Sequence, residues 1–176
     1  MRLFHTSDRI LPEPDVHYGR VNADFGQGFY LTPEREFALR WAGERAVINV
    51  YEFDLSGLKV HRFERDAAWF DYIFHNRRAE DRLDADVVAG PIANDTIFDT
   101  MGIFSSGFLT AEEALRLLSV GPCYTQFALK TERAAAQLRW LEAEPIASPD
   151  AAHRRQEQER YWQALGEAMA EISDPA

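Results

Sequence analysis

The chain has 176 residues, of which 46% are hydrophobic and 12% aromatic, enough for one domain with a packed core. No run approaches the roughly 18–20 apolar residues that a membrane helix needs, so we expect no membrane partner. The single cysteine, Cys123, excludes an internal disulfide framework and any metal site built from several cysteines.

The formal net charge of −10 disfavours non-specific binding to a phosphate backbone. It does not exclude a local basic patch. The acidic charge favours a partner with a basic surface, or it serves only to keep the protein in solution. The first residues lack the long apolar core of a signal peptide. With the low cysteine content, this predicts a cytoplasmic protein.

The N-terminal third is predicted to contain short strands, one loop and one helix. Apolar, β-branched and aromatic runs predict strands at residues 3–5, 28–32, 46–53 and 58–63. Residues 9–20 contain two prolines and a glycine and are predicted to be a loop. A helix over 34–46 is favoured because Thr32 suits the N-cap and Pro33 suits the first turn.

The middle of the chain mixes helices and strands. The expected elements are a helix at 67–78, a strand at 85–92, a helix or aromatic-rich connection at 96–104, a helix at 110–119 and a strand at 123–131. Thr110 and Glu113 have the spacing of a capping box at the start of the helix predicted at 110–119.

The C-terminal part is predicted to be mainly helical. Residues 132–142 are expected to form a helix or a turn, and residues 145–150 a linker. Residues 151–172 carry apolar side chains at helical spacing, which predicts a helix that packs on the domain or serves as a dimer or partner surface. The chain is therefore divided into a domain at 1–144 and a linker with a C-terminal helix at 145–176.

Two motifs carry the strongest chemical signal. His5, Thr6 and Ser7 form a polar triplet at the end of the first predicted strand. Some twenty residues later, the stretch Asp24-Phe25-Gly26-Gln27-Gly28-Phe29-Tyr30-Leu31-Thr32 leads through a glycine-punctuated turn into a second strand. The histidines show no helical metal-ligand spacing, so no metal is expected.

Together with Gln126 on a later strand, His5 and Tyr30 resemble the three-strand signature of ADP-ribosyltransferases of the diphtheria-toxin and poly-ADP-ribose-polymerase type. More closely, the chain resembles a family of small, toxin-type bacterial ADP-ribosyltransferase-like proteins, over roughly residues 2–140. Shared motifs are the histidine triplet, the 24–32 stretch, Asn76-Arg77 and Asp86-Val-Val-Ala-Gly-Pro-Ile-Ala93.

This resemblance implies an α+β fold with an ADP-ribosyltransferase-like split antiparallel β-sheet core, flanking helices and a central NAD cleft. The implied activity is NAD-dependent mono-ADP-ribosyl transfer to a macromolecular acceptor, which is protein, DNA or RNA. NAD is then a substrate. The family's setting implies a bacterial toxin or defence effector restrained by a cognate antitoxin.

The resemblance also implies roles for the first motif. His5 would hydrogen-bond a ribose hydroxyl, the backbone of Thr6 would contact the carboxamide, and Ser7 would add a hydroxyl contact. Tyr30 would stack on the nicotinamide ring through its π-face. Each residue also has a plain structural alternative, in a strand or in the core.

Further residues complete the expected site. Gly26 and Gly28 would let the backbone approach the ligand closely, and Asp24 would fix this loop or hydrogen-bond the ligand. Arg77 would grip the NAD pyrophosphate or an acceptor phosphate. The alternative for Arg77 is a structural network that joins it to Asp71 and Asp86.

Two other groups have a chemical and a structural interpretation. Asp71 and Asp95 are candidates for a base that activates the acceptor, and turn chemistry alone also explains Asp95 and the adjacent Asn94. Cys123 lies in an apolar strand context, which predicts a buried rather than a nucleophilic thiol.

Gln126 departs from the pattern of many transferases, which place a glutamate here. Its amide oxygen can accept a hydrogen bond from a ribose hydroxyl, but it supplies neither negative charge nor a base. This argues against chain-elongating poly-ADP-ribosylation. It also leaves open an NAD hydrolase or RNA 2′-phosphotransferase-like enzyme, a non-catalytic module that binds an NAD-derived ligand or a partner, and a mere surface strand glutamine.

Overall fold

The computed structural model describes residues 1–43, 46–79, 81–93, 107, 109–146 and 151–173, with side chains omitted for 151–154. In chain order its elements are β1 (Arg2–Ser7), β2 (Phe29–Leu31), α1 (Arg35–Arg40), β3 (Val47–Phe53), β4 (Val60–Arg62), α2 (Ala67–Asn76), β5 (Val87–Pro91), α4 (Ala111–Leu118), β6 (Thr125–Leu129), α5 (Glu132–Ala135), β7 (Leu138–Pro145) and α6 (Ala151–Ser173).

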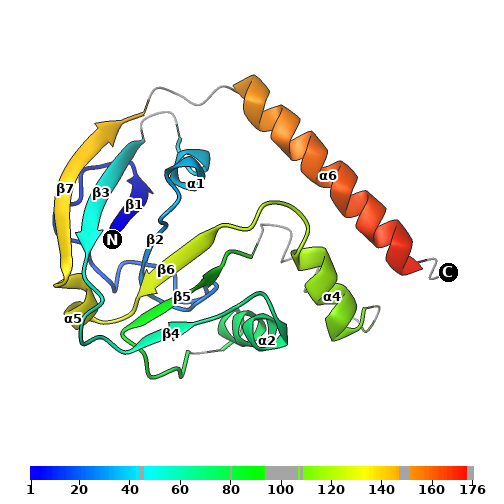
Figure 1. Ribbon diagram of the computed structural model, residues 1–176, viewed down its shortest axis with the longest axis horizontal. Helices are drawn as coiled ribbons and strands as arrows, with labels where there is room; N and C mark the ends of the chain where they lie inside the picture. Colours follow the sequence, from blue (N-terminus) through cyan, green and yellow to red (C-terminus); the bar gives the residue numbers. More distant parts are fainter. Residues whose placement is uncertain (44–45, 80, 94–106, 108, 147–150, 174–176) are drawn as a thin grey trace.

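The strands form two sheets. One has the order β1-β3-β7 and the other β2-β6-β5-β4. All their pairings are antiparallel except that of β4 with β5, which is parallel. The predicted α+β class is therefore confirmed, and Figure 1 shows the two sheets beside each other with α2 and α4 at the second.

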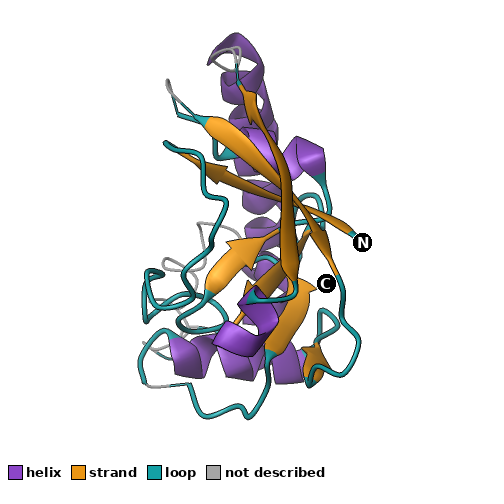
Figure 2. Cartoon of the chain, turned by 90° about the vertical axis from the view of Figure 1, so that its left-hand side faces the viewer, coloured by secondary structure: helices purple, strands orange, loops and turns teal. Residues whose placement is uncertain are grey.

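The two sheets meet where β1 and β2 pair briefly. The amide of Phe4 donates to the carbonyl of Thr32 at 2.8 Å, and the amide of Thr32 donates back at 3.0 Å. Turned by 90°, Figure 2 shows the strands of the two sheets running in different directions. The split in the sheet therefore lies next to His5.

Alternation along the strands divides the core. On one face of the second sheet, Phe29, Leu31, Phe127 and Leu129 pack with Tyr51 and Phe53 of the first sheet. On the opposite face, the core is built from residues of α2, α4 and the strands, namely Phe25, Trp69, Phe70, Ile73, Val88, Ala114, Leu118 and Ala128. Tyr30 packs against this second cluster.

The most important difference from the sequence-based expectation is β7. The stretch 132–142 is predicted to be a helix or a turn, but α5 is short and β7 follows as an edge strand along β3. Its partner lies about ninety residues earlier in the chain, and local patterns carry no information on such a pairing. The strand ends at Pro145, just beyond the predicted domain limit.

The helix starts show one error and one success. α1 begins after Glu34 rather than after Thr32; the hydroxyl of Thr32 accepts from the amide of Glu34 at 3.2 Å and donates to the carbonyl of Thr125 on β6 at 2.8 Å. The capping box of α4 is present as predicted, with Thr110 and Glu113 bonding each other's amides. The segment predicted at 96–104 lies outside the described residues.

The long C-terminal helix α6 contacts α4, and Figure 1 shows its C-terminal half next to that helix. Leu165 is buried, Glu171 pairs with Arg116 on α4, and Glu157 pairs with Arg40 on α1 at 2.7 Å. This favours the first of the two predicted roles, packing on the domain. No helix in the described part of the chain is both long and apolar enough to cross a membrane.

Candidate active site

His5 holds the split open by taking a backbone acceptor of β2. Its ring nitrogen Nδ1 lies 2.7 Å from the carbonyl oxygen of Tyr30. A carbonyl only accepts, so Nδ1 carries the proton and donates. Burial lowers the pKa of His5 and the bond to Tyr30 raises it, with burial the larger effect. The ring is therefore neutral at pH 7. Its Nε2 is an acceptor, and no described residue donates a hydrogen bond to it.

The same bond leaves the backbone of Thr6 unpaired. If the Phe4–Thr32 ladder continued, the next hydrogen-bonded pair would join Thr6 to Tyr30. The Tyr30 carbonyl is instead bonded to His5, and no described residue takes up the Thr6 amide or carbonyl. The side chain of Thr6 donates to the carbonyl of Ala38 on α1, which fixes this edge.

Tyr30 turns its side chain away from His5. Its hydroxyl donates to the carbonyl of Gly26 at 2.6 Å and accepts from the amide of Phe25 at 3.0 Å. Burial raises the pKa of this phenol, and the charge of Asp24 raises it further. His5 packs on Phe29, whose side chain points to the other face of β2. The structure thus joins His5 to the backbone of Tyr30 and not to its ring.

Asp24 is the centre of a buried polar network. One carboxylate oxygen accepts from Nε of Arg77 at 3.0 Å and from its Nη2. The other accepts from Nε2 of Gln126 at 2.9 Å and from the amide of Ala93 at 3.3 Å. Asn76 on α2 donates to the backbone carbonyl of Asp24 at 3.2 Å. The network ties the 24–28 turn to α2, β5 and β6.

Gln126 is 3% exposed, so its interpretation as a surface strand residue is wrong. It lies on β6 two residues before Ala128, which pairs with Tyr30, and Gln126 and Tyr30 therefore project to the same face of the sheet. The amide oxygen of Gln126 makes no hydrogen bond to any described residue.

The two glycines of the motif serve close packing of the chain. Gly26 has φ +73°, and an added Cβ would lie 2.8 Å from Cβ of Asp81 and from Nζ of Lys130. At Gly28 an added Cβ would lie 2.6 Å from the carbonyl oxygen of Leu129 on β6. Protein atoms therefore occupy the space in which a ligand was expected to approach.

Arg77 belongs to a structural network, as its alternative interpretation predicts, but its described partner is Asp24 and not Asp71 or Asp86. The side chains of Arg77 and Asp24 are 12% and 8% exposed, and they form a buried ion pair. Asp71 is exposed on α2, while Asp86 bonds Thr131 and the amide of Lys59. The side chains of Asp71, Asp86 and Arg77 therefore have different surroundings in the fold.

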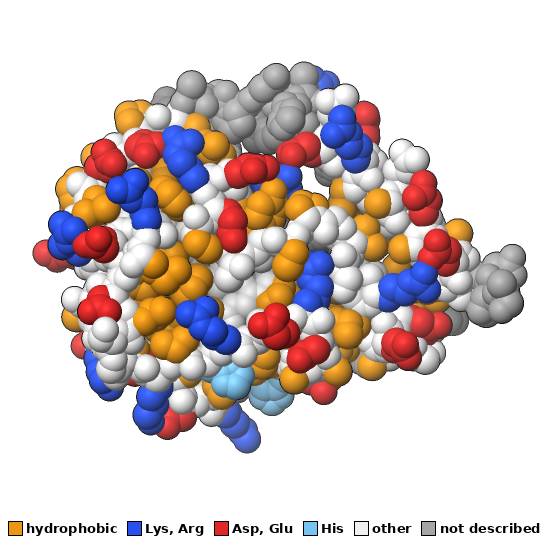
Figure 3. All heavy atoms as spheres, in the orientation of Figure 1, with side chains coloured by type: hydrophobic (Ala, Val, Ile, Leu, Met, Phe, Trp, Pro, Cys, Tyr) orange, Lys and Arg blue, Asp and Glu red, His pale blue; other side chains and the backbone are white. Residues whose placement is uncertain are grey.

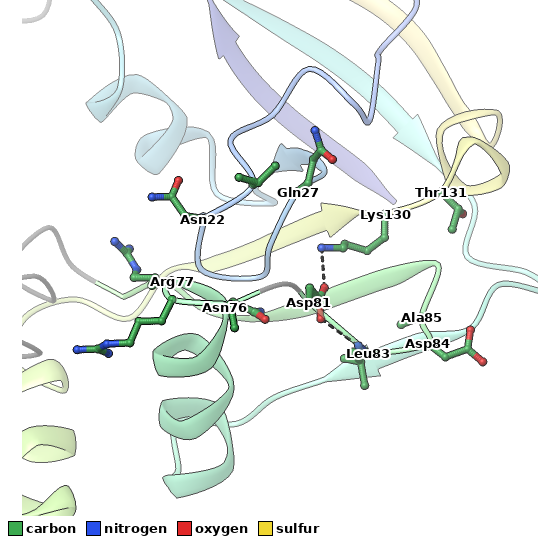
Figure 4. Close-up of a pocket in the computed structure, with 13 residues that line it drawn as sticks. Asn22, Gln27, Asn76, Arg77, Asp81, Leu83, Asp84, Ala85, Lys130 and Thr131 are labelled. Atoms are coloured by element: carbon green, nitrogen blue, oxygen red, sulfur yellow. Dashed lines mark hydrogen bonds and ion pairs between the residues drawn. The ribbon is translucent and has the colours of Figure 1, made fainter. Parts of the chain in front are cut away.

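Arg77 also lines a cavity of about 760 Å³ between α2, the 19–28 loop and the end of β6 (Figure 4). Asn22, Gln27 and Asn76 contribute amides, and Lys130 and Asp81 lie opposite each other in it. His5, Tyr30 and Gln126 do not line this cavity. Of the residues expected to bind NAD, Arg77 lines this cavity, while His5 and Thr6 lie at the split between the sheets.

Sequence reasoning missed Lys130 and Asp81. Lys130 Nζ lies 2.8 Å from Asp81 and donates to the carbonyl of Phe25, and Tyr72 donates to Asp81 at 3.0 Å. Burial lowers the pKa of Lys130, against the raising effect of Asp81. The signal available in the sequence was a lysine directly after an apolar strand. Its partner Asp81 could not be predicted, because it lies in an irregular segment after α2.

The remaining predicted residues have minor or undescribed places. Ser7 accepts from the amide of Arg9 at 3.2 Å and contacts Asp8. Cys123 is exposed, which overturns the expectation of a buried thiol, because β6 begins only at Thr125. Asn94 and Asp95 lie outside the described residues. Within the described part of the chain no cluster of metal-ligating side chains occurs.

The surface shows no single charged region on the face seen in Figure 3, where acidic and basic side chains alternate with apolar ones. A comparison with family models matches residues 1–140 to the family described as "Protein of unknown function (DUF3990)". A search of curated proteins finds no match.

Proposed function

The chain belongs to the DUF3990 family, and we propose that it is an NAD-dependent mono-ADP-ribosyltransferase. The observation that carries the proposal is the unpaired backbone edge of Thr6 beside a neutral His5, at the split between the two sheets. Both come from the sequence motifs that resemble those of ADP-ribosyltransferases.

The edge of Thr6 is complementary to a primary carboxamide. An amide N–H and a carbonyl on the same strand edge match the oxygen and the NH₂ group of the nicotinamide carboxamide. Nε2 of His5, an acceptor, suits a ribose hydroxyl one group further along the ligand. These contacts fix the nicotinamide and its ribose relative to each other, which lowers the entropic part of the barrier.

In the proposed reaction the bond between the ribose C1′ and the nicotinamide nitrogen breaks. Its electron pair moves to the ring nitrogen, which becomes neutral, and nicotinamide leaves. A nucleophilic atom of the acceptor forms the new bond to C1′ and gives up its proton to solvent. Positive charge develops on the ribose, and the amide oxygen of Gln126 would orient a ribose hydroxyl there.

A non-catalytic binding module is the second candidate, because Gln126 is uncharged and the nearby carboxylate of Asp24 is paired with Arg77. Such a module would bind NAD or a derived ligand at the same edge without cleaving it. Release of nicotinamide separates it from the transferase.

The test uses adenine-labelled NAD, a bacterial lysate, the wild type and His5→Ala, with His61→Ala as an exposed-histidine control. We expect label in the protein, DNA or RNA fraction with the wild type and the control, and its loss with His5→Ala. Free nicotinamide without labelled acceptor indicates NAD hydrolysis. If no variant, including the wild type, produces labelled acceptor or free nicotinamide, the result contradicts an enzymatic function.

A further inference from the structure

We propose that Asp24 is a positioning residue that sets the orientation of the Gln126 amide. Its carboxylate holds the amide nitrogen inward, so that the amide oxygen is the group presented to the substrate ribose. The inference rests on the proposed function and identifies what makes an uncharged residue usable at position 126.

The chemistry of the contact fixes which end of the amide faces Asp24. Nε2 of Gln126 lies 2.9 Å from Oδ2 of Asp24. A carboxylate oxygen accepts only, so the NH₂ end must face it, and the reversed amide would bring two acceptors together. With Gln126 3% and Asp24 7% exposed, water has little access to relieve such a clash.

Asp24 is itself held rigidly. Arg77 from α2 binds one oxygen, the amide of Ala93 after β5 binds the other, and Asn76 holds its backbone. These contacts fix the carboxylate before any ligand arrives. A group restrained in this way orients its neighbour without further reorganisation during the reaction.

Charge balance explains the residue type at 126. Asp24 and Arg77 form a buried pair with no net charge, and neutral Gln126 completes it. A glutamate at 126 would bring a second carboxylate to hydrogen-bond distance of the first, and the repulsion between the like charges would disfavour it. The presence of Asp24 therefore requires an uncharged donor at this position.

The test compares the wild type with Asp24→Asn, Gln126→Glu and the double variant, with Asp54→Asn as a control for loss of an exposed carboxylate. In Asp24→Asn, the new amide would keep its oxygen on Arg77 and turn its NH₂ toward Gln126. The Gln126 amide must then reverse and present a donor. In the double variant, the NH₂ group introduced at position 24 would hold one oxygen of the carboxylate introduced at position 126 and leave the other as an acceptor.

We expect kcat/KM for nicotinamide release to fall by on the order of tenfold in Asp24→Asn. The double variant should recover most of that loss, while Gln126→Glu alone should lower the melting temperature. The Asp54→Asn control should match the wild type. Recovery of kcat/KM by the double variant, measured at a temperature at which all the variants are folded, is the result that a merely structural role for Asp24 would not produce.

Two results would overturn the inference. One is an Asp24→Asn variant that loses stability but keeps wild-type kcat/KM. The other is a double variant that regains its melting temperature but stays as slow as Asp24→Asn. Both results require an active wild type. They therefore differ from failure of the proposed function, in which the folded wild type releases no nicotinamide at all. In that case the role of Asp24 and Gln126 toward a ribose is also contradicted.

Discussion

The side chain of His5 takes the place that the backbone of Thr6 would otherwise hold, because its Nδ1 donates to the carbonyl of Tyr30 at 2.7 Å. This single contact ends the pairing of β1 with β2 after Phe4 and Thr32. The backbone of Thr6 is thus left without a partner among the described residues, at the split between the two sheets.

The lowered pKa of His5 predicts that stability falls in mild acid. As the pH drops below about 6.5, the ordinary value, the unfolded chain takes up a proton that the folded chain resists. The free energy of unfolding should therefore decrease below pH 6.5 and level off below the pKa of the folded state. Denaturant unfolding between about pH 8 and pH 5 measures this.

His5→Gln provides the comparison, since it removes the titration and keeps a donor. Its stability should decrease less than that of the wild type over the same pH interval. Parallel curves for the two proteins would show that the His5 pKa is not lowered in the folded state.

Tyr30→Phe should separate the hydroxyl from the ring. The phenol bonds Gly26 and Phe25, so its loss should lower the free energy of unfolding by about 1–3 kcal/mol. The ring stays packed against the second core cluster, away from the Thr6 edge at which NAD is proposed to bind, so KM for NAD should stay near the wild-type value. Thermal unfolding and NAD titration measure the two effects, and a strongly raised KM in a stable variant would place the hydroxyl itself in the binding site.

Lys130→Met should be strongly destabilising. The ammonium and Asp81 are 11% and 10% exposed, and removing one partner leaves the other charge buried, at a cost of about 3–5 kcal/mol. Arg139→Met is the matched control, because Arg139 and Glu52 are 68% and 57% exposed and solvent screens such a pair, so its loss should change stability little. Equal losses in the two variants, measured by urea unfolding, would contradict the buried pair.

Gly26→Ala and Gly166→Ala should change stability in opposite directions. At Gly26 the positive φ and the contacts with Asp81 and Lys130 leave no room for a methyl group. At Gly166, inside α6, an added Cβ meets no described atom within 4 Å, so alanine should stabilise the helix by about 1 kcal/mol. Melting temperatures of the two variants test this, and a stable Gly26→Ala would mean that the 24–28 turn adjusts easily.

Local patterns were sufficient for most elements of the fold. Apolar runs predicted β1, β2, β3, β4, β5 and β6, helical spacing predicted α2 and α6, and a capping box predicted the start of α4. These succeeded because the signals, side-chain alternation and capping, act within a few residues. The α+β class follows from the same elements.

Non-local contacts decided the rest. β7 forms because β3 offers it a partner, and Thr32 at the predicted start of α1 is bonded to Thr125 on β6. No local pattern distinguishes a strand residue that faces solvent from one that meets a carboxylate about a hundred positions away, as Gln126 meets Asp24.

The sequence by itself determined which residue types are present in the two motifs, and so the resemblance on which the proposed activity rests. Only the tertiary structure decided their partners: His5 with the Tyr30 backbone, and Asp24 with both Arg77 and Gln126. The physical reason is that a buried polar group must find a partner of opposite hydrogen-bonding character, and packing of distant segments determines which one it meets.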